Sequence, residues 1–367
     1  MSETLGVLNL RSNNFNAAIP DAFPAYCSLK TIDLNGNFIT GKVPTSLASC
    51  SSLEILDLGS NKMIDNFPCF LMNMPTLRVI VLRSNKFYGS TVCPNINETS
   101  TVLQIIDMAH NNFSGELPIQ WLTKSQAMMA TNKSDHNIKL KHLKFEFLQF
   151  SPSVYYQDAV IVTSKGLELE LVKILTIYTS IDISSNNFQD SIPEELGKLQ
   201  GLRLLNLSNN ALTGKIPSSI GNMRKLESLD LSNNKLSGTI PTSLQQLNFL
   251  SSFNLSFNKV VGRVPGGNQL QTFSADSYMG IEGLCGFPLE KSCPDQVESP
   301  KERNSRTGSA EIDWNVICGL VGLVFGFGVV VWPLVFCKIW RKRYYERVDE
   351  IGVRIFPRLY QTSFDEA

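Results

Sequence analysis

The sixteen residues LRLLNLSNNALTGKIP, at positions 202–217, decide the fold, because their pattern recurs along the chain. Successive copies begin 24 residues apart, except for one step of 26 and one of 75. Nine units at one period indicate leucine-rich repeats, which stack into a solenoid. The first leucine-type positions of the units are Leu5, Leu29, Leu53, Leu77, Leu103, Tyr178, Leu202, Leu226 and Leu250.

Each unit predicts one short strand from an alternation such as Leu56 and Leu58. Alternate residues of a strand point to opposite faces, so the leucine-type side chains point into the core and those between them point outward. We therefore expect a right-handed solenoid of α/β type, the plant extracellular leucine-rich-repeat kind, with a parallel sheet on its concave side.

An asparagine follows each strand at the same position of every repeat. Its amide can bond to turning backbone groups that no sheet satisfies. The sequence therefore predicts a buried, hydrogen-bonded ladder with a structural role, formed by Asn13, Asn37, Asn61, Asn85, Asn111, Asn186, Asn210, Asn234 and Asn258.

The second half of each unit has the pattern glycine, any residue, an apolar residue and proline, as in Gly214–Pro217. Glycine permits a turn, and proline stiffens the crossing to the convex side. Eight of the nine repeats carry the proline, and the fourth has Ser-Thr-Val-Cys after Gly89 instead.

The repeats and the segments between them predict seven parts of the chain. About fifty residues interrupt the series; they form either a folded island packed on the solenoid, which we expect from the apolar segment at 154–162, or a loose insertion. The parts are repeats 1–5 at 1–126, the island at 127–177, repeats 6–9 at 178–273, a C-terminal cap at 274–294, a juxtamembrane linker at 295–313, a transmembrane helix at 314–337 and a cytosolic tail at 338–367.

The transmembrane helix is predicted from 24 residues without a charge, enough to span a bilayer. Basic residues follow it directly, which places the tail in the cytosol and the repeats outside the cell, in a single-pass plasma-membrane protein. Gly322 and Gly326 are spaced to let another helix approach closely, although glycine is also common in membrane helices by composition.

Composition excludes several classes of protein. Lysine plus arginine and aspartate plus glutamate both total 33, so the chain lacks the basic excess typical of nucleic-acid binding. With three histidines and no zinc-like spacing, we expect no metal and no cofactor. No catalytic constellation is legible and the tail is too short for a kinase, so we expect no enzyme.

Cysteine spacing predicts disulfides, with buried free thiols as the alternative. Cys69 and Cys93 have the same offset in adjacent repeats, which places them within disulfide reach. Cys285 and Cys293 can close the cap, and the offsets of Cys27 and Cys50 make a looser candidate pair. Glycosylation sequons, which agree with secretion, stand at Asn97, Asn112, Asn132, Asn206 and Asn254.

These features together resemble plant leucine-rich-repeat receptor-like proteins of the Verticillium-wilt-resistance and Cf immune-receptor class. The island ending at Tyr155–Gly166, the four repeats after it, the Gly-Leu-Cys-Gly cap and one membrane helix with a short basic tail carry the resemblance. It implies a kinase-less cell-surface receptor that senses a pathogen-derived or developmental ligand, an extracellular protein or peptide. It also implies signalling through a leucine-rich-repeat adaptor kinase and a co-receptor kinase.

The start of the chain differs from that pattern, because residues 1–5 lead straight into a repeat with no signal peptide or cap. We expect a C-terminal portion of a longer receptor, with a truncated, non-signalling remnant as the alternative. A second alternative is a soluble-style binding module like the plant inhibitors of polygalacturonases, which the membrane helix disfavours.

Candidate ligand-binding residues lie where the outward strand positions vary between repeats. The column after each strand varies in size and charge in the first four repeats, whereas the last four have serine. A varied row favours specificity and a uniform row favours scaffold, although a solvated strand face is the simpler interpretation. The candidates are Arg11, Asn35, Arg78, Arg83 and His110.

Overall fold

The computed structural model describes residues 5–94, 96, 101–129, 143–146, 155–164, 167–267 and 269–293. The chain divides into two compact units, residues 1–294 and 295–367, and all described residues belong to the first unit. The predicted linker, transmembrane helix and cytosolic tail lie outside the described residues. Within the described part, no helix combines the length and apolar character needed to cross a membrane.

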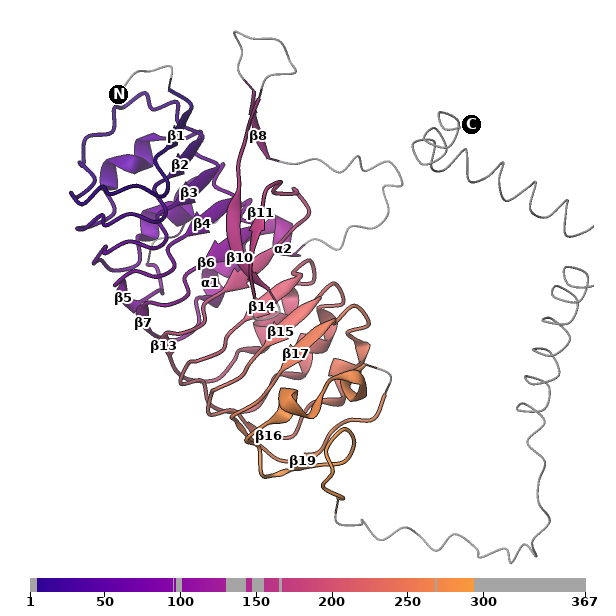
Figure 1. Ribbon diagram of the computed structural model, residues 1–367. Coiled ribbons are helices and arrows are strands. Elements are labelled where there is room, and N and C mark those ends of the chain that lie inside the picture. The colour runs from indigo at the N-terminus through magenta and orange to yellow at the C-terminus, as the bar shows by residue number, and fades with distance from the viewer. Residues whose placement is uncertain are drawn as a thin grey trace, which may run out of the picture. The chain divides into compact units, whose positions relative to one another are not determined.

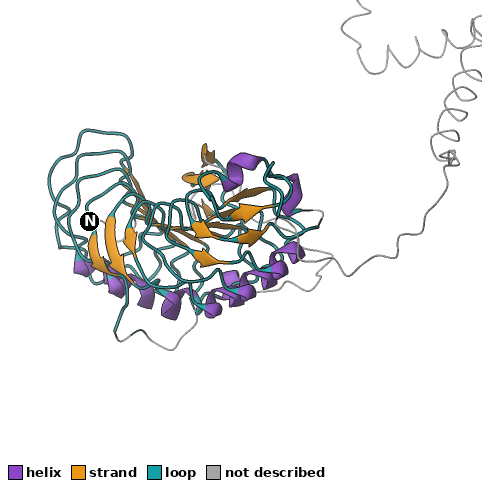
Figure 2. Ribbon diagram, turned by 90° about the horizontal axis from the view of Figure 1, so that it is seen from below, coloured by secondary structure: helices purple, strands orange, loops and turns teal. Residues whose placement is uncertain are grey.

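A nine-stranded parallel sheet lines the concave side of the first unit, as the repeat pattern predicts (Figures 1 and 2). Each strand pairs with the next at one repeat's offset; Leu56 lies opposite Ile80, for example. The strands, in their order across the sheet, are β1 (Val7–Asn9), β2 (Thr31–Asp33), β3 (Ile55–Asp57), β4 (Val79–Val81), β6 (Ile105–Asp107), β12 (Ser180–Asp182), β14 (Leu204–Asn206), β15 (Ser228–Asp230) and β17 (Ser252–Asn254).

The insertion does not interrupt this sheet. Strand β6 pairs directly with β12, so that Ile106 lies opposite Ile181 although 75 residues separate them. The fifth and sixth repeats therefore stack as neighbours. The island is inserted between them without separating them.

Short helices form the convex side (Figure 2). Each of the five 3-10 helices in the repeats begins directly after a proline, whose fixed φ suits the residue before a helix. They are η1 (Thr45–Ser49), η2 (Cys69–Asn73), η3 (Glu194–Lys198), η4 (Ser218–Asn222) and η5 (Thr242–Gln246). The fifth repeat has instead the α-helices α1 (Ile119–Leu122) and α2 (Gln126–Met129).

Smaller strands pair where the chain turns from the concave to the convex side. They are β5 (Tyr88–Ser90), β7 (Asn112–Gly115) and β13 (Asn187–Phe188) in one sheet, and β16 (Ser237–Gly238) with β18 (Lys259–Val260) in another. The last turn carries η6 (Leu270–Thr272), η7 (Ala275–Tyr278) and the paired strands β19 (Gly262–Arg263) and β20 (Leu284–Cys285).

The predicted asparagine ladder is present. The Asn61 amide donates to the carbonyls of Leu34 and Leu58, at 2.9 and 3.1 Å, and its oxygen accepts from the backbone N–H of Ile39 at 3.0 Å. Each asparagine thus joins two neighbouring repeats, and the corresponding bonds recur at Asn37, Asn85, Asn111, Asn186, Asn210, Asn234 and Asn258.

Three disulfides join the cysteine pairs that the spacing predicted. Cys27 is bonded to Cys50, Cys69 to Cys93 and Cys285 to Cys293, with Cα atoms 4.5, 5.5 and 5.0 Å apart. The first two bonds link adjacent repeats, and the third closes the cap.

The island contributes two antiparallel pairs of strands. Strands β8 (Lys144–Glu146) and β9 (Tyr155–Gln157) form one pair, and β10 (Val160–Ser164) and β11 (Leu167–Leu171) form a hairpin. The hairpin lies against the concave sheet, because the buried side chains of Val160 and Val162 share a hydrophobic cluster with sheet residues such as Val79 and Ile105. The expectation that the island packs on the solenoid is confirmed.

Candidate ligand-binding site

The concave face carries a column of acidic or amide side chains that the sequence analysis missed. In each unit except the fourth, an aspartate or asparagine stands between the two inward leucine-type residues, as Asp57 does between Leu56 and Leu58. Its Oδ1 accepts the backbone N–H two residues on, at 2.9 Å from Gly59 for Asp57. The signal was legible in the sequence, since a short polar side chain at that point can close such a turn. Members with the same bond are Asn9, Asp33, Asp107, Asp182, Asn206, Asp230 and Asn254.

The hairpin covers the part of this column that lies in the first repeats. Arg83 connects the two, because its Nη1 lies 3.1 Å from Asp107 Oδ2 and 3.0 Å from Thr163 Oγ1 on β10. Arg83 and Asp107 are both almost fully buried. A buried guanidinium that contacts both a carboxyl group and a hydroxyl group fixes orientation well, so Arg83 sets where the hairpin rests.

Two further contacts hold the island toward the first strand. Arg11 forms an ion pair with Glu170 of β11 at 2.9 Å, and the Asn9 amide donates to the Tyr156 hydroxyl at 2.6 Å. Glu170 is half exposed, so this ion pair contributes little to stability.

Burial raises the pKa of several carboxyl groups around the hairpin. The pKa of Asp107 rises to about 8, because the group is buried and the charge of Asp182 adds to the effect, while Arg83 opposes it. The pKa of Asp33 rises to about 7 through burial and the neighbouring Asp57. Burial likewise raises the pKa of Asp57 and Asp182. Like carboxylates that share few cations cannot all ionise, so this region holds protons at mildly acidic pH.

The hairpin itself contributes one such group. Asp158, which precedes β10, is 4% exposed, and a hydrogen bond from the Thr31 side chain reaches it. Burial, with a smaller contribution from the charge of Glu54, raises the pKa of Asp158 to about 6. The contact between island and sheet therefore includes a carboxyl group that titrates in a physiological range.

The structure brings three of the five predicted ligand-binding residues into this region. Arg11 pairs with the island, Arg83 is buried, and Asn35 is buried and donates to Asp57 Oδ1 at 3.0 Å. These side chains hold the concave surface together, and Asn35 and Arg83 are closed to a ligand in this conformation. The sequence could not show this, because the island that pairs with Arg11 and Arg83 lies far along the chain.

The other two predicted residues lie elsewhere. The Arg78 side chain is 3.8 Å from Glu54, which also lies 3.8 Å from Lys30, so it belongs to a charged row beside the strands. His110 is exposed at a turn with a φ of 54°.

The serine side chains of the column in the later repeats form hydrogen bonds within their own repeats. The hydroxyl groups of Ser208, Ser232 and Ser256 donate to Asn206, Asp230 and Asn254 at 2.8, 2.7 and 2.8 Å. This agrees with a scaffold role for the uniform row.

A polar pocket of about 250 Å³ opens beyond the hairpin, over β14, β15 and β17. Its floor includes Asn206, Asp230 and Asn254, and its walls include Thr163 of the hairpin and Asp276 of η7. This pocket offers polar groups to a ligand on the concave face.

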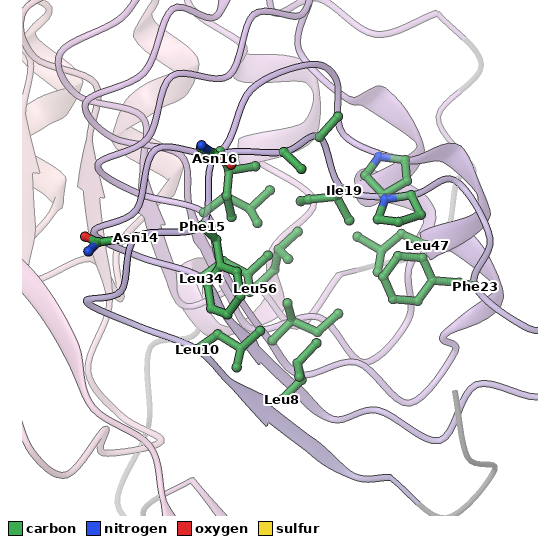
Figure 3. Close-up of a pocket in the computed structure, with 17 residues that line it drawn as sticks. Leu8, Leu10, Asn14, Phe15, Asn16, Ile19, Phe23, Leu34, Leu47 and Leu56 are labelled. Atoms are coloured by element: carbon green, nitrogen blue, oxygen red, sulfur yellow. The ribbon is translucent and has the colours of Figure 1, made fainter.

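A larger pocket of about 420 Å³ lies at the other end of the unit and is apolar (Figure 3). Leu8, Leu10, Phe15, Ile19 and Phe23 line it together with core residues of the next repeats. It is the open end of the hydrophobic core beside the first repeat, and its lining contains no charged group that could orient a ligand.

The predicted modification sites fall in different places. Asn112 is exposed on β7, whereas Asn206 and Asn254 lie on the concave floor. Asn97, Asn132 and the helix-association residues Gly322 and Gly326 lie outside the described residues.

Comparison with known families and proteins gives a consistent result. The leucine-rich repeat family model matches residues 3–63 and 176–236. Receptor-like protein 34 of Arabidopsis thaliana is 51% identical over 226 residues, 62% of this chain and 23% of that protein. Receptor-like protein 9DC3 of Solanum pimpinellifolium is 51% identical over 249 residues, 66% of this chain and 28% of that protein. The chain thus spans less than a third of these relatives.

Solved structures share the fold. The ectodomain of the plant membrane receptor kinase GASSHO1/SCHENGEN3 from Arabidopsis thaliana, in complex with CASPARIAN STRIP INTEGRITY FACTOR 2, is similar over 80% of this chain and 31% of that chain, with a TM-score of 0.56 and 25% identity. The crystal structure of PEPR1-AtPEP1 gives a TM-score of 0.55 at 26% identity, over 78% of this chain and 31% of that chain. A plant ice-binding protein gives 0.57 at 22% identity, over 79% and 76% of the two chains, and shows the shared fold alone.

Proposed function

Because the chain is a leucine-rich-repeat protein of the plant receptor-like class, we propose that it is a kinase-less cell-surface receptor for an extracellular protein or peptide ligand. In this proposal it signals in plant defence through an associated receptor kinase. The observation that carries the proposal is the concave face, where a docked hairpin covers one part and leaves a polar pocket open beside it.

The form of that face supports recognition of a protein or peptide. A ligand can lie along the outward positions of β14, β15 and β17 and contact the hairpin at the same time, since Thr163 belongs to the pocket wall. The ectodomain of GASSHO1/SCHENGEN3, solved in complex with CASPARIAN STRIP INTEGRITY FACTOR 2, shares the fold and supports the same kind of role.

The proposed topology places the repeats outside the cell, residues 314–337 across the plasma membrane and the tail in the cytosol. Three disulfides support an oxidising, extracellular location for the repeats. The proposed partners are a leucine-rich-repeat adaptor kinase and a co-receptor kinase. The spacing of Gly322 and Gly326 supports close contact with a partner helix in the membrane.

A site-specific crosslinking experiment tests recognition by the concave face. A photoreactive amino acid replaces Ser252 on the concave side or Gln246 on the convex side of the preceding repeat, in the full chain preceded by a secretion leader. After incubation with extracellular fluid from infected leaves, we expect a discrete adduct at Ser252 that excess unlabelled protein competes away. Adducts at Gln246 alone, or none that compete, would contradict the proposal.

A second experiment tests the kinase partner. Replacing Gly322 and Gly326 with leucine separates packed helices, so recovery of the adaptor kinase by co-precipitation should fall by roughly tenfold, from a loss of about 1–2 kcal/mol. Replacing Val324 and Val331 with leucine is the control, since at 3.6 residues per turn these positions fall on the side of the predicted helix opposite the glycine pair. Equal recovery from all three proteins would move the contact to the juxtamembrane residues Glu311 and Asp313.

A further inference from the structure

We propose that the polar pocket between the hairpin and η7 binds a cationic side chain, arginine foremost, of the extracellular ligand. This inference rests on the proposed function and adds the chemical class of the group recognised. It follows from the charges of the pocket, from the hydrogen bonds that hold Asp230 on its floor, and from its size.

The pocket is acidic. Asp230, in the middle of the floor, and Asp276, on the wall, contribute carboxylates, and the lining contains no lysine, arginine or histidine. The other polar lining groups are asparagine amides and the hydroxyl groups of serines and Thr163, which offer oxygen acceptors. A guanidinium group has five donors in a planar fork, and it suits a site that combines carboxylate and neutral oxygen acceptors.

The floor holds Asp230 in a fixed orientation. Its Oδ1 accepts both the backbone N–H of Ser232 at 2.9 Å and the Ser232 hydroxyl at 2.7 Å. Within the described part of the chain, no donor bonds to Oδ2. One oxygen therefore anchors the carboxylate and the other is free to receive a ligand.

Asp230 also differs from the acidic residues of the same column in earlier repeats. Asp57 is within the field of Arg11 and Arg83, and Asp107 is within that of Arg83. The positions opposite Asp230 in the sheet are Asn206 and Asn254, which are neutral. The nearby arginine, Arg203, pairs with Glu227 instead. An external cation would offset the charge that the protein leaves at Asp230.

The size of the pocket fits a single side chain. Sites for drug-sized ligands measure about 300–1,000 Å³, and this pocket, at about 250 Å³, is smaller. A ligand would therefore insert one residue here while its backbone lies along the serine column.

Two glycosylation sequons provide a further test of the proposal, because Asn206 and Asn254 both line the pocket. A glycan on either residue would occupy the space beside Asp230. The proposal therefore requires that Asn206 and Asn254 are unmodified in the mature protein, and mass spectrometry of the secreted protein tests this directly. Full occupancy of either residue by a glycan overturns the proposal.

The binding test uses the full chain, produced with a secretion leader and purified in detergent. The probes are acetyl-Gly-Arg-Gly-amide and the same peptide with neutral citrulline, which keeps the shape of arginine without its charge. Saturation-transfer NMR should show the arginine peptide binding with a Kd on the order of 1 mM, and the citrulline peptide at least tenfold more weakly.

The variant Asp230→Ala/Asp276→Asn should weaken binding of the arginine peptide by roughly tenfold or more. Alanine replaces Asp230 because asparagine at that position would create an Asn-Leu-Ser glycosylation sequon inside the pocket. Asp190→Asn is the matched control, because Asp190 is exposed outside the pocket, and it should bind as the unmodified protein does. Equal binding of both peptides, no binding below about 10 mM, or no effect of the double variant overturns the proposal. If these results appear while the Ser252 adduct persists, the receptor function stands and the cation site fails.

Discussion

The docking of the hairpin on the concave sheet should depend on pH through Asp158, and Asp158→Asn should remove part of that dependence. Burial raises the pKa of Asp158 from 3.8 to about 6. Asparagine keeps the shape and can accept the bond from Thr31, but it does not ionise. The titratable groups that interact with this site include Glu54, Asp33 and Tyr156, and none of them is changed by the substitution.

The magnitude follows from the pKa shift. The folded protein holds this proton more tightly than the unfolded chain does, so its stabilising effect is fully present below about pH 4 and is lost as the pH rises through 6. The whole shift corresponds to about 3 kcal/mol at most. About 1.4 kcal/mol of this is lost between pH 5 and pH 8, which is a factor of about ten in the opening equilibrium of the hairpin.

Hydrogen exchange measures this opening, because the amides of Val160 and Val162 lie in the paired strand β10. Their protection factors, corrected for the intrinsic pH dependence of exchange, should fall about tenfold more from pH 5 to pH 8 in the unmodified protein than in Asp158→Asn. Asp190→Asn is the control and should behave as the unmodified protein. An identical fall in all three proteins would refute the reasoning.

The remaining predictions concern the solenoid. Asn234→Ala removes bonds to Leu207 and Leu231 and leaves the N–H of Leu212 without its acceptor, so the free energy of unfolding in urea should fall by about 2–3 kcal/mol, whereas exposed Asn248→Ala should change it little. Gly221→Ala should lower the free energy of unfolding in urea by more than about 2 kcal/mol, because a Cβ there would lie 2.4 Å from the carbonyl oxygen of Ser243. Gly266→Ala is the control in the same urea experiment, since a Cβ there meets no atom closer than 3.8 Å. Cys69 and Cys93 should resist alkylation in secreted protein until a reductant is added, and peptide mapping that finds either one alkylated beforehand would contradict the disulfide.

The sequence was sufficient for the solenoid because a fixed period imposes its own geometry. Once Leu56 and Leu58 point inward, every residue 24 positions away has the same environment, and the sheet, the asparagine ladder and the stacked cysteines follow. The island is different, because no period relates it to the repeats. The contact of Arg83 with Thr163 joins residues 80 apart, and only the folded chain shows that Arg83 is buried there.

The pocket illustrates the same limit. The aspartate column could have been recognised from the residue between the inward leucine-type positions, and Asp230 would then have been a candidate. The surroundings of Asp230 could not have been predicted, because the pocket walls come from Thr163 of the hairpin and Asp276 of η7, which lie outside the repeats that form the floor. Variation along the strand face pointed instead to Arg11 and Arg83, which contact the island, and to Asn35, which bonds to Asp57 within the sheet.

The placement of the disulfides has a mechanical consequence. Bonds join repeats near the N-terminal end and within the cap, while no disulfide spans the described residues between Cys93 and Cys285. Under a pulling force applied along the solenoid, disulfides resist separation near both ends of the described repeats. Between Cys93 and Cys285, neighbouring repeats are held together by hydrogen bonds and packing. Rupture should therefore begin in the middle, where it would release about 190 residues and roughly 600 Å of extended chain. In a force spectroscopy experiment, the island and the polar pocket would be lost in this step, while the linked ends keep their chain compact.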